Sequence, residues 1–438
     1  PPADTAPTGP AAWQAPLPHA GSTGELARWW QQFDDPLLAP LIEAAQQASP
    51  TLAQSRSRVE QARATRTASG AALAPSLNAT ASASRGRQDV SAPLGTSLSA
   101  GLQAAWEIDL FGANAAGRDA AQARLDAAAS GWHEARVAVA AEVASSYLDL
   151  RACEAQLVTT RQDAASRAET ARLTGLSANA GFQAPASAAL ARASAAQGNA
   201  TLTQLQASCD RSVKALVALT ALDEPTLRSR MAQRTARLPQ PTELGVARVP
   251  AEVLNQRPDV DAAARELLAA SADVDQAQAQ RLPRIALSGN LGAARFDSGA
   301  TTLDGTVWSL GPLSVSLPLF DAGTRRANVV AARARYDAAA SAYRGTLRTA
   351  VREVEEALLT LQSTAARDPD ARTATDGFEA SYRATEARYQ GGLASLFELE
   401  DARRSAVQAN SALIDLQRER VAAWIALYRA LGGGWNRA

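Results

Sequence analysis

Two long stretches of the chain carry apolar residues at intervals of three and four positions, the spacing that places them on one face of an α-helix. In the second stretch the pattern runs from about Asn328 to about Leu431 and is interrupted once, at Gly391-Gly392. The first stretch is interrupted in the same way at Gly181. Because glycine tolerates the backbone conformations of tight turns, each interruption predicts a turn between two long antiparallel helices.

Between the helical stretches the pattern changes to alternation. From Leu98 to Leu110 every even position is apolar, whereas odd positions include Gln103 and Glu107. This run of about 13 residues is longer than a usual globular strand, which favours a tilted membrane-spanning strand with its apolar side chains outward. A soluble antiparallel sheet with one wet face explains the alternation equally well. We expect four strands, at about 75–88, 98–111, 283–296 and 307–320.

The two halves of the chain repeat one design. The run Asp126–Ser130 recurs unchanged at Asp337–Ser341, about 210 positions later. An internal repeat of this kind predicts that each half supplies two strands and one helical hairpin. The sequence accordingly divides into an extended or disordered leader, repeat 1, an equatorial linker, repeat 2 and a C-terminal tail, over residues 1–27, 28–222, 223–256, 257–433 and 434–438.

Composition and strand number narrow the possible functions. Basic and acidic residues number 44 each, so the chain lacks the basic excess typical of nucleic-acid binding. No run of about 20 apolar residues is present to form a transmembrane helix. Four strands cannot close a membrane barrel, because the smallest barrels have about eight and open edges in lipid leave backbone groups unpaired. Three chains would supply twelve strands, so a trimer is the simplest count, although the arithmetic also permits a dimer.

Four motifs occur in order along the chain: Trp29-Trp30 with Phe33 and Asp35-Pro36, then Trp106–Gly112, Arg257–Val260 and Leu317–Gly323. Together they resemble the TolC-like outer-membrane factor family, in particular the branch typified by NodT and OprM, over about Trp29 to Gly433. The resemblance implies a mixed, mainly α-helical fold. In it, a homotrimer combines a twelve-stranded outer-membrane β-barrel with a periplasmic tunnel of helical hairpins.

The same resemblance implies a location and partners. The location is the outer membrane of a Gram-negative bacterium, in contact with its lipid and with a long periplasmic extension. The partners are a periplasmic adaptor protein and an inner-membrane transporter. The chain would be a passive exit duct for small molecules such as drugs or metals, without catalysis or a cofactor.

In that family the two hairpin turns form the periplasmic gate. Beyond the second turn, Glu398 and Asp401 lie three positions apart on one helical face, so three chains would bring six carboxylates near one axis. A ring of like charges at a narrow opening favours cations. Tyr389 and Arg404 match family positions that tie the closed tip, which implies hydrogen bonds across neighbouring hairpins. Alternatively, the two carboxylates only complement the positive N-terminus of their helix.

The two cysteines, Cys153 and Cys209, lie at equal distances along the sequence on either side of Gly181. In a hairpin folded at that glycine they would be level, and exported proteins meet an oxidising compartment. Helix axes pack about 8 to 10 Å apart, whereas a disulfide needs Cα atoms within about 7 Å, so both side chains must face inward. The sequence therefore predicts either a disulfide or two buried free thiols.

Enzymatic function has little support in the sequence. Only two histidines are present, His19 in the leader and His133 in a helical pattern, so a metal cluster or a catalytic triad lacks material. Two other functions remain open. One is the outlet of a type I protein-secretion system, and the other is a coiled-coil scaffold without a channel. The exported substrate cannot be read from the sequence, because a duct selects weakly.

Overall fold

The computed structural model describes residues 14, 29–30, 33, 35–87, 94–239, 254, 256–298 and 301–435. Apart from Gln14, the predicted leader at 1–27 lies outside these residues, as do most of the second half of the predicted linker and the last three residues of the tail. The chain forms two compact units. The sheet unit comprises the described parts of Ser55–Trp132 and Asp259–Thr346, and the hairpin unit those of Pro7–Gln54, His133–Pro258 and Leu347–Ala438.

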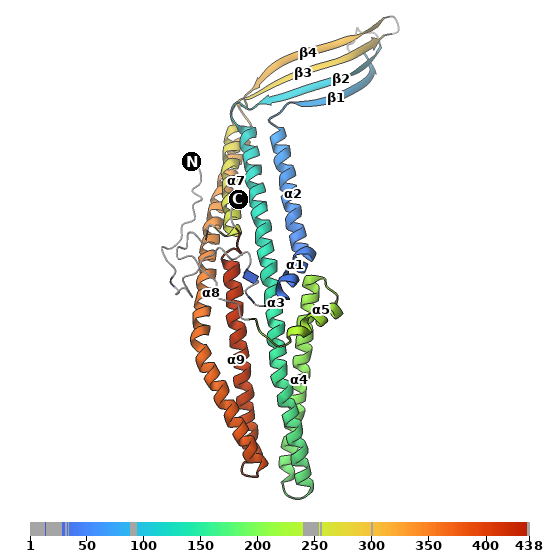
Figure 1. Cartoon of the computed structure of the whole chain (residues 1–438). Helices are drawn as coiled ribbons and strands as arrows, with labels where there is room; N and C mark the ends of the chain where they lie inside the picture. The colour runs from blue at the N-terminus through green and yellow to red at the C-terminus, as the bar shows by residue number, and fades with distance from the viewer. Residues whose placement is uncertain are drawn as a thin grey trace. The chain divides into compact units, whose positions relative to one another are not determined.

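The sheet unit contains four antiparallel strands in the order β1-β2-β3-β4 (Figure 1). The strands are β1 (Ser76–Gly86), β2 (Gly95–Ile108), β3 (Arg284–Asp297) and β4 (Thr302–Ser316). The central pairing, β2 with β3, joins a strand of the first repeat to a strand of the second. The duplicated halves therefore build one continuous sheet.

Each repeat passes from its second strand into a long helix through an aspartate. Asp109 accepts backbone hydrogen bonds of 3.1 and 2.7 Å at the start of α3 (Ala113–Asn179). In the second repeat Asp321 accepts backbone hydrogen bonds of 3.0 and 3.1 Å at the start of α8 (Thr324–Gln390). These carboxylates satisfy N–H groups that have no partner within the helix. The same backbone bonds lower the pKa of Asp321.

The strand ends differ from the predicted ranges where the chain leaves the sheet. Strand β2 begins at Gly95 and ends at Ile108, three residues earlier than predicted at both ends. It ends at Ile108 because the next residue, Asp109, caps α3. Strand β4 covers Thr302–Ser316 and not 307–320. Pro318 lies beyond this strand, and it has no N–H group to donate to a ladder.

The register of the strands separates an apolar face from a polar face. Leu102 of β2 lies opposite Ala79 of β1 and Leu291 of β3. On the other face, Ser99 lies opposite Ser82 with their hydroxyl oxygens 2.7 Å apart. The leucines at 102 and 291 are 45% and 54% exposed. A single chain therefore leaves the apolar face of its sheet uncovered.

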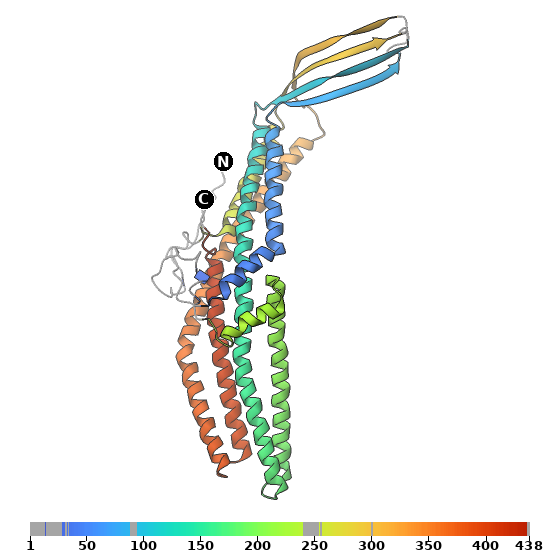
Figure 2. The ribbon, with the colours of Figure 1, turned by 45° about the vertical axis from the view of Figure 1, so that its right-hand side comes forward.

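Helices of the sheet unit are held together by polar contacts. Helix α2 (Pro50–Ala71) contacts α3 through Arg66, whose Nε donates to Gln122 at 3.1 Å. Helix α7 (Pro258–Ala279) contacts α3 through Ser130, whose hydroxyl donates to Asp261 at 2.7 Å. Helices α2, α3 and α7 lie side by side in both views (Figure 2). Among the described residues, no helix combines the length and the apolar character needed to cross a membrane.

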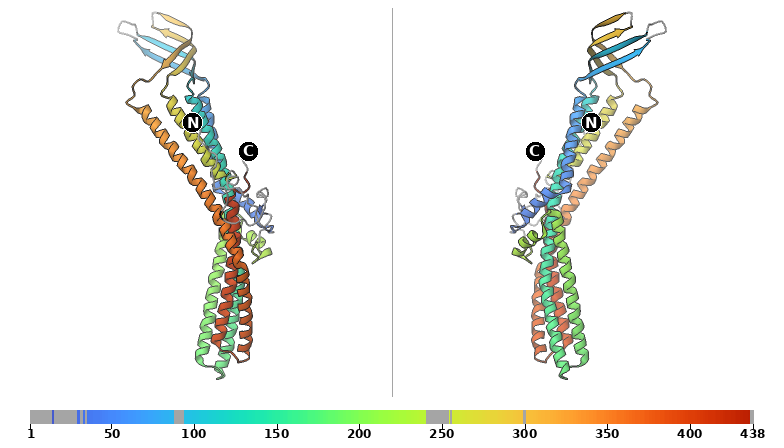
Figure 3. Two further views of the ribbon diagram at one scale, coloured as in Figure 1. Left: turned by 90° about the vertical axis from the view of Figure 1, so that its left-hand side faces the viewer. Right: turned by 90° about the vertical axis from the view of Figure 1, so that its right-hand side faces the viewer.

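The hairpin unit contains the far ends of α3 and α8, together with α4 (Pro185–Thr220) and α9 (Leu396–Ala430). Helices α3 and α4 meet at a turn where Gly181 has φ +81°, and α8 and α9 meet at a turn where Gly392 has φ +72°. Figure 3 shows the four helices side by side. The described residues of this unit also form the short elements α1 (Leu38–Ala48), α5 (Glu224–Met231) and the 3₁₀ turn η2 (Ala232–Arg234).

The aromatic motif that includes Trp29 and Trp30 lies in the core of the hairpin unit. The ring of Trp29 stacks on Tyr428 of α9 at 4.9 Å and contacts Phe33 edge-on at 4.7 Å. Trp30 contacts the same tyrosine at 4.5 Å. Trp29 is fully buried. Aromatic burial of this size fixes the N-terminal segment to the C-terminal helix.

Two glycines allow β2 and β3 to approach closely on the polar face. Gly101 lies opposite Gly292, and a Cβ atom at Gly101 would be 2.8 Å from the carbonyl oxygen of Leu291. At Gly292 a Cβ would be 2.6 Å from the carbonyl oxygen of Ala100. Both contacts are with backbone atoms, so no side-chain rearrangement relieves them.

We therefore expect Gly101→Val to destabilise the sheet by roughly 1 to 3 kcal/mol, the usual effect of overpacking. Gly305→Val in β4 is the matched control, because a Cβ there meets nothing within 4 Å. Thermal unfolding of the detergent-purified proteins measures both effects. Equal unfolding temperatures for the two variants would contradict the close approach.

Candidate gate at the hairpin ends

Asp401 and Arg404 lie on the exposed side of α9. Their side chains form an ion pair one helical turn apart and are 55% and 69% exposed. Within one chain, Arg404 therefore bonds to its own helix, and among the described residues it makes no hydrogen bond to the other hairpin. An exposed pair of this kind contributes only about 0 to 1 kcal/mol. Asp401 is thus held loosely and open to solvent.

Glu398 caps the start of α9. Its carboxylate accepts a hydrogen bond of 2.7 Å from the backbone N–H of Ser395, whose hydroxyl accepts one of 3.2 Å from the N–H of Glu398. The bond from that backbone N–H of Ser395 is the main cause that lowers the pKa of Glu398. Because the pKa of Glu398 is lower in the folded chain than in the unfolded chain, its carboxylate stabilises the fold at pH values above the unfolded pKa. This stabilisation is lost as the pH falls through the folded pKa. The structure thus shows the alternative role of Glu398, in which its carboxylate complements the N-terminus of its helix.

Tyr389 connects the two hairpins of the chain. Its hydroxyl lies 2.9 Å from that of Thr174 on α3. About two helical turns away, the hydroxyl of Tyr382 lies 2.9 Å from that of Ser166. Both tyrosines also pack against an apolar cluster that includes Leu399. Among the described residues, Tyr389 is the predicted gate residue that shares a hydrogen bond with the neighbouring hairpin of its own chain.

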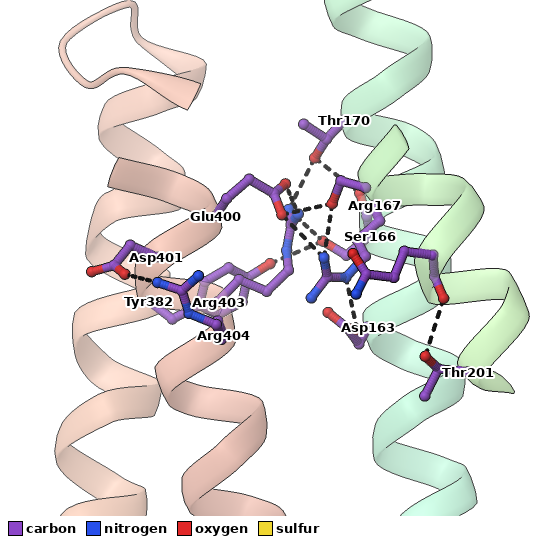
Figure 4. Close-up of polar contacts among 12 residues, drawn as sticks. Asp163, Ser166, Arg167, Thr170, Thr201, Tyr382, Glu400, Asp401, Arg403 and Arg404 are labelled. Atoms are coloured by element: carbon purple, nitrogen blue, oxygen red, sulfur yellow. Dashed lines mark hydrogen bonds and ion pairs between the residues drawn. The ribbon is translucent and has the colours of Figure 1, made fainter. Parts of the chain in front are cut away.

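Sequence reasoning missed the strongest connection between the hairpins, which centres on Arg403. This arginine is 2% exposed, and its guanidinium donates to the hydroxyls of Thr170 at 2.9 Å and Ser166 at 3.2 Å, both on α3. It also pairs with Glu400 on its own helix. Figure 4 shows Arg403 and Glu400 directed toward α3, with Asp401 and Arg404 on the other side of α9.

Glu400 extends the connection to a third helix. One of its carboxylate oxygens lies 3.2 Å from Arg167 of α3 and accepts a hydrogen bond of 2.8 Å from Ser194 of α4. Arg167 in turn lies 2.8 Å from Asp163. Two arginines and two carboxylates therefore balance within a largely buried cluster that spans α3, α4 and α9. Such a cluster holds the helices in one arrangement, because separating them would leave buried charges unpaired.

A polar cavity of about 260 Å³ adjoins this cluster. Its lining includes Asp163, Ser166, Tyr382 and Arg403. Oδ1 of Asp163 and Nε of Arg403 are buried without a protein hydrogen-bond partner. A cavity of this size with both donors and acceptors has room for water. In the described ranges no three His, Cys, Asp or Glu side chains are grouped to hold a metal ion.

The position of Arg403 in α9 offered a signal that could have found it. Leu396, Leu399, Arg403 and Ala406 are all buried and are spaced by three, four and three residues. That spacing marks the face of a helix that packs against another helix. An arginine on such a face must find polar partners, because an unpaired buried charge is costly.

The first hairpin carries a covalent link. Cys153 of α3 and Cys209 of α4 form a disulfide, with their Cα atoms 5.6 Å apart. Both residues are buried. The second hairpin contains no cysteine. Apart from the turns, a covalent bond therefore joins α3 to α4, whereas none joins α8 to α9.

We expect Arg403→Met to destabilise the hairpin unit by about 3 kcal/mol, because Thr170 and Ser166 lose their donor and Glu400 loses one of its two cationic partners. Arg404→Met is the matched control at the next position, where loss of an exposed pair costs less than about 1 kcal/mol. Chemical unfolding followed by circular dichroism compares the variants. Equal losses would show that the burial of Arg403 contributes nothing.

Replacing both cysteines by serine should lower the stability of the folded chain by about 2 to 4 kcal/mol, because the open chain gains conformational freedom when unfolded. The measurement is thermal unfolding with and without a thiol reductant. Reductant should lower the unfolding temperature of the parent and leave the serine variant unchanged. A parent insensitive to reductant under unfolding conditions would count against the bond.

Comparison with known proteins places this geometry in a family. The family model described as "Outer membrane efflux protein" matches residues 41–222 and 249–433, most of the chain. Outer membrane protein OprJ of Pseudomonas aeruginosa is 31% identical over an aligned length of 427, and the match covers 93% of this chain and 86% of that protein. The pyoverdine export outer membrane protein OpmQ of Pseudomonas putida is 31% identical over an aligned length of 458, and the match covers 98% of this chain and 92% of OpmQ.

Solved structures agree with this assignment. The structure of the outer-membrane channel OprN has a TM-score of 0.86 and 29% identity, over 97% of this chain and 98% of that one. Its correspondence extends through both repeats, since it covers nearly the whole of each chain. The predicted resemblance to TolC-like outer-membrane factors is confirmed, with its mainly helical duplicated fold and its outer-membrane location. The chain belongs to the outer membrane efflux protein family.

Proposed function

We propose that this protein is the exit duct of a tripartite export system and passively conducts small molecules to the cell exterior. The observation that carries the proposal is the sheet, whose strands of 11, 14, 14 and 15 residues separate an apolar face from a polar one. Strands of this length suit a membrane crossing, with apolar side chains toward lipid and polar side chains toward a lumen. A periplasmic adaptor and an inner-membrane transporter would supply the cargo.

A homotrimer accounts for the unsatisfied edges of the sheet. Among the described residues of the chain, β1 pairs only with β2, and β4 pairs only with β3. Pairing β4 of one copy with β1 of the next around a three-fold axis would close twelve strands into a barrel. Closure supplies partners for edge backbone groups that would each cost several kcal/mol in lipid. The proposed domain division follows, with each repeat giving two strands to the barrel and one hairpin to the tunnel.

The gate in this proposal lies at the hairpin ends, where Asp401 would form a ring of carboxylates. Its exposure and its loose pairing with Arg404 support a position facing an axis. Glu398 would add negative charge beside the ring while capping its helix. Tyr389 would hold the second hairpin against the first when the gate is closed.

The relatives guide the substrate class in this proposal. OpmQ is named for the export of pyoverdine, a small molecule, which favours drug, metal or similar small-molecule efflux over a type I protein-secretion outlet. Family membership removes the coiled-coil scaffold from consideration. No chemistry in the proposal requires catalysis by the chain.

The test is conductance in a planar bilayer. We expect small cation-selective currents from the parent, and lower cation selectivity from a variant with Asp401→Asn and Glu398→Gln. Glutamine retains the capping geometry at 398, so this change removes charge without removing the cap. The control is Glu419→Gln, an exposed carboxylate of α9 that pairs with Arg367 well away from the turn.

Two outcomes would contradict the proposal. If neither the parent nor any variant carried current although each was folded and inserted in the membrane, a duct would be excluded. Equal losses of selectivity in the control and the gate variant would keep the duct but remove the gate from Asp401 and Glu398. A transporter gene for a secreted protein beside this gene would favour the type I outlet.

A further inference from the structure

The polar face of the sheet is almost free of charge. The register assigns to this face alternate residues of each strand, with a change of phase at the bulge in β4. Most of them are hydroxyl, amide and small residues: Ser76, Asn78, Thr80, Ser82 and Ser84 of β1; Ser97, Ser99, Gly101, Gln103 and Ala105 of β2; Ala286, Ser288, Asn290, Gly292 and Ala294 of β3; Gly305, Val307, Ser309, Ser314 and Ser316 of β4. Two large apolar residues, Phe296 and Leu303, lie opposite each other on the same face, at the strand ends remote from α3.

Two charged residues are the exceptions, and they lie together. Glu107 of β2 is opposite Ala286 of β3, so Arg284, two positions before Ala286, shares the face of Glu107. Diagonal neighbours of this kind have Cα atoms about 7 to 8 Å apart. Both residues lie at the end of the strands where β2 leads into α3. The described residues provide neither side chain with an ion pair.

The other charges of the strands lie on the opposite face. Arg295 is opposite Leu98, within the row of apolar residues, and Asp304 is opposite Arg295. Arg85 and Asp297 are likewise in this row, both opposite Thr96. These four residues lie toward the strand ends that are remote from Glu107. They therefore contribute little to the potential at the polar face.

We infer that Glu107 and Arg284 form a charge-balanced ring at the helix-side mouth of the sheet. This inference rests on the proposed duct, in which three copies place three glutamates and three arginines around one axis. Rings of charged side chains set the ion selectivity of pores. A ring with equal numbers of both signs, below a neutral wall, admits cations, anions and zwitterions alike. The sheet segment then suits cargo of mixed charge, and selectivity arises elsewhere.

The test removes one sign at a time. All variants carry Asp401→Asn and Glu398→Gln, so that the hairpin ends add no carboxylates. Arg284→Gln leaves only glutamates and should raise the permeability ratio of K⁺ to Cl⁻ by roughly threefold or more, and Glu107→Gln should lower it to a similar extent. The double variant should return to the starting ratio. Arg295→Gln, on the apolar face, is the control and should change nothing.

A second measurement does not depend on the resistance of the hairpin ends. Because both native cysteines are bonded, Gln103→Cys introduces a single free thiol on the polar face. Cationic and anionic methanethiosulfonates should modify it at similar rates, and Arg284→Gln should raise the rate of the cationic reagent relative to the anionic one. Leu102→Cys, on the apolar face, should react with neither in the membrane.

The outcomes separate this inference from the proposed function. The ring would be overturned, with the duct left intact, if Arg284→Gln and Glu107→Gln had the same permeability ratio and if Arg284→Gln left the labelling rates of Gln103→Cys unchanged. If Arg295→Gln raised the permeability ratio as much as Arg284→Gln does, the effect would come from surface charge in general, and this result would also overturn the ring. Absence of current from every folded variant, together with no labelling of the Gln103→Cys variant by either reagent, would overturn both.

Discussion

The open edges of the sheet constrain everything else in this protein. Strands β1 and β4 each use one edge within the chain, and the apolar face carries leucines such as Leu310, which is 81% exposed. In lipid, unpaired backbone groups are far more costly than exposed apolar side chains, so the edges require neighbouring strands while the face requires only lipid. In the proposed homotrimer the neighbouring copies would supply these strands, so that assembly and membrane insertion would depend on each other.

The hairpin unit meets a different constraint, because it holds charges among helices. Arg403 is buried and bound to both hairpins, yet its equivalent in the first repeat, Arg192, is exposed. The duplication thus preserved the residue and not its role. One consequence is asymmetry: the second hairpin reaches across to the first through side chains, whereas the first is tied internally by a disulfide.

Much of this architecture could be predicted from the sequence, since it depends on periodic patterns. Alternation located four strands, and the glycines at 181 and 392 located both turns, because φ values near +70 to +80° favour glycine. The end of β4 could not be placed by alternation, since Leu317 and Leu319 continue the pattern beyond the strand. The hydrogen-bond partners of the arginines in α9 were harder still to predict from the sequence. Arg403 and Arg404 are adjacent and chemically identical, and only the helix face that each occupies decides which is buried.

The disulfide also changes how the chain is connected. Residues 153 to 209 form a covalently closed ring, whose turn exposes Phe182 at 85% of its surface. A protease that cuts this turn opens the ring without releasing a fragment, so the two pieces stay together under denaturing conditions until the bond is reduced. The corresponding turn of the second hairpin, with Leu393 at 74% exposure, has no such link, and the same cut there would divide the chain. The two halves of one duplicated design thus differ in what a single broken peptide bond does to them.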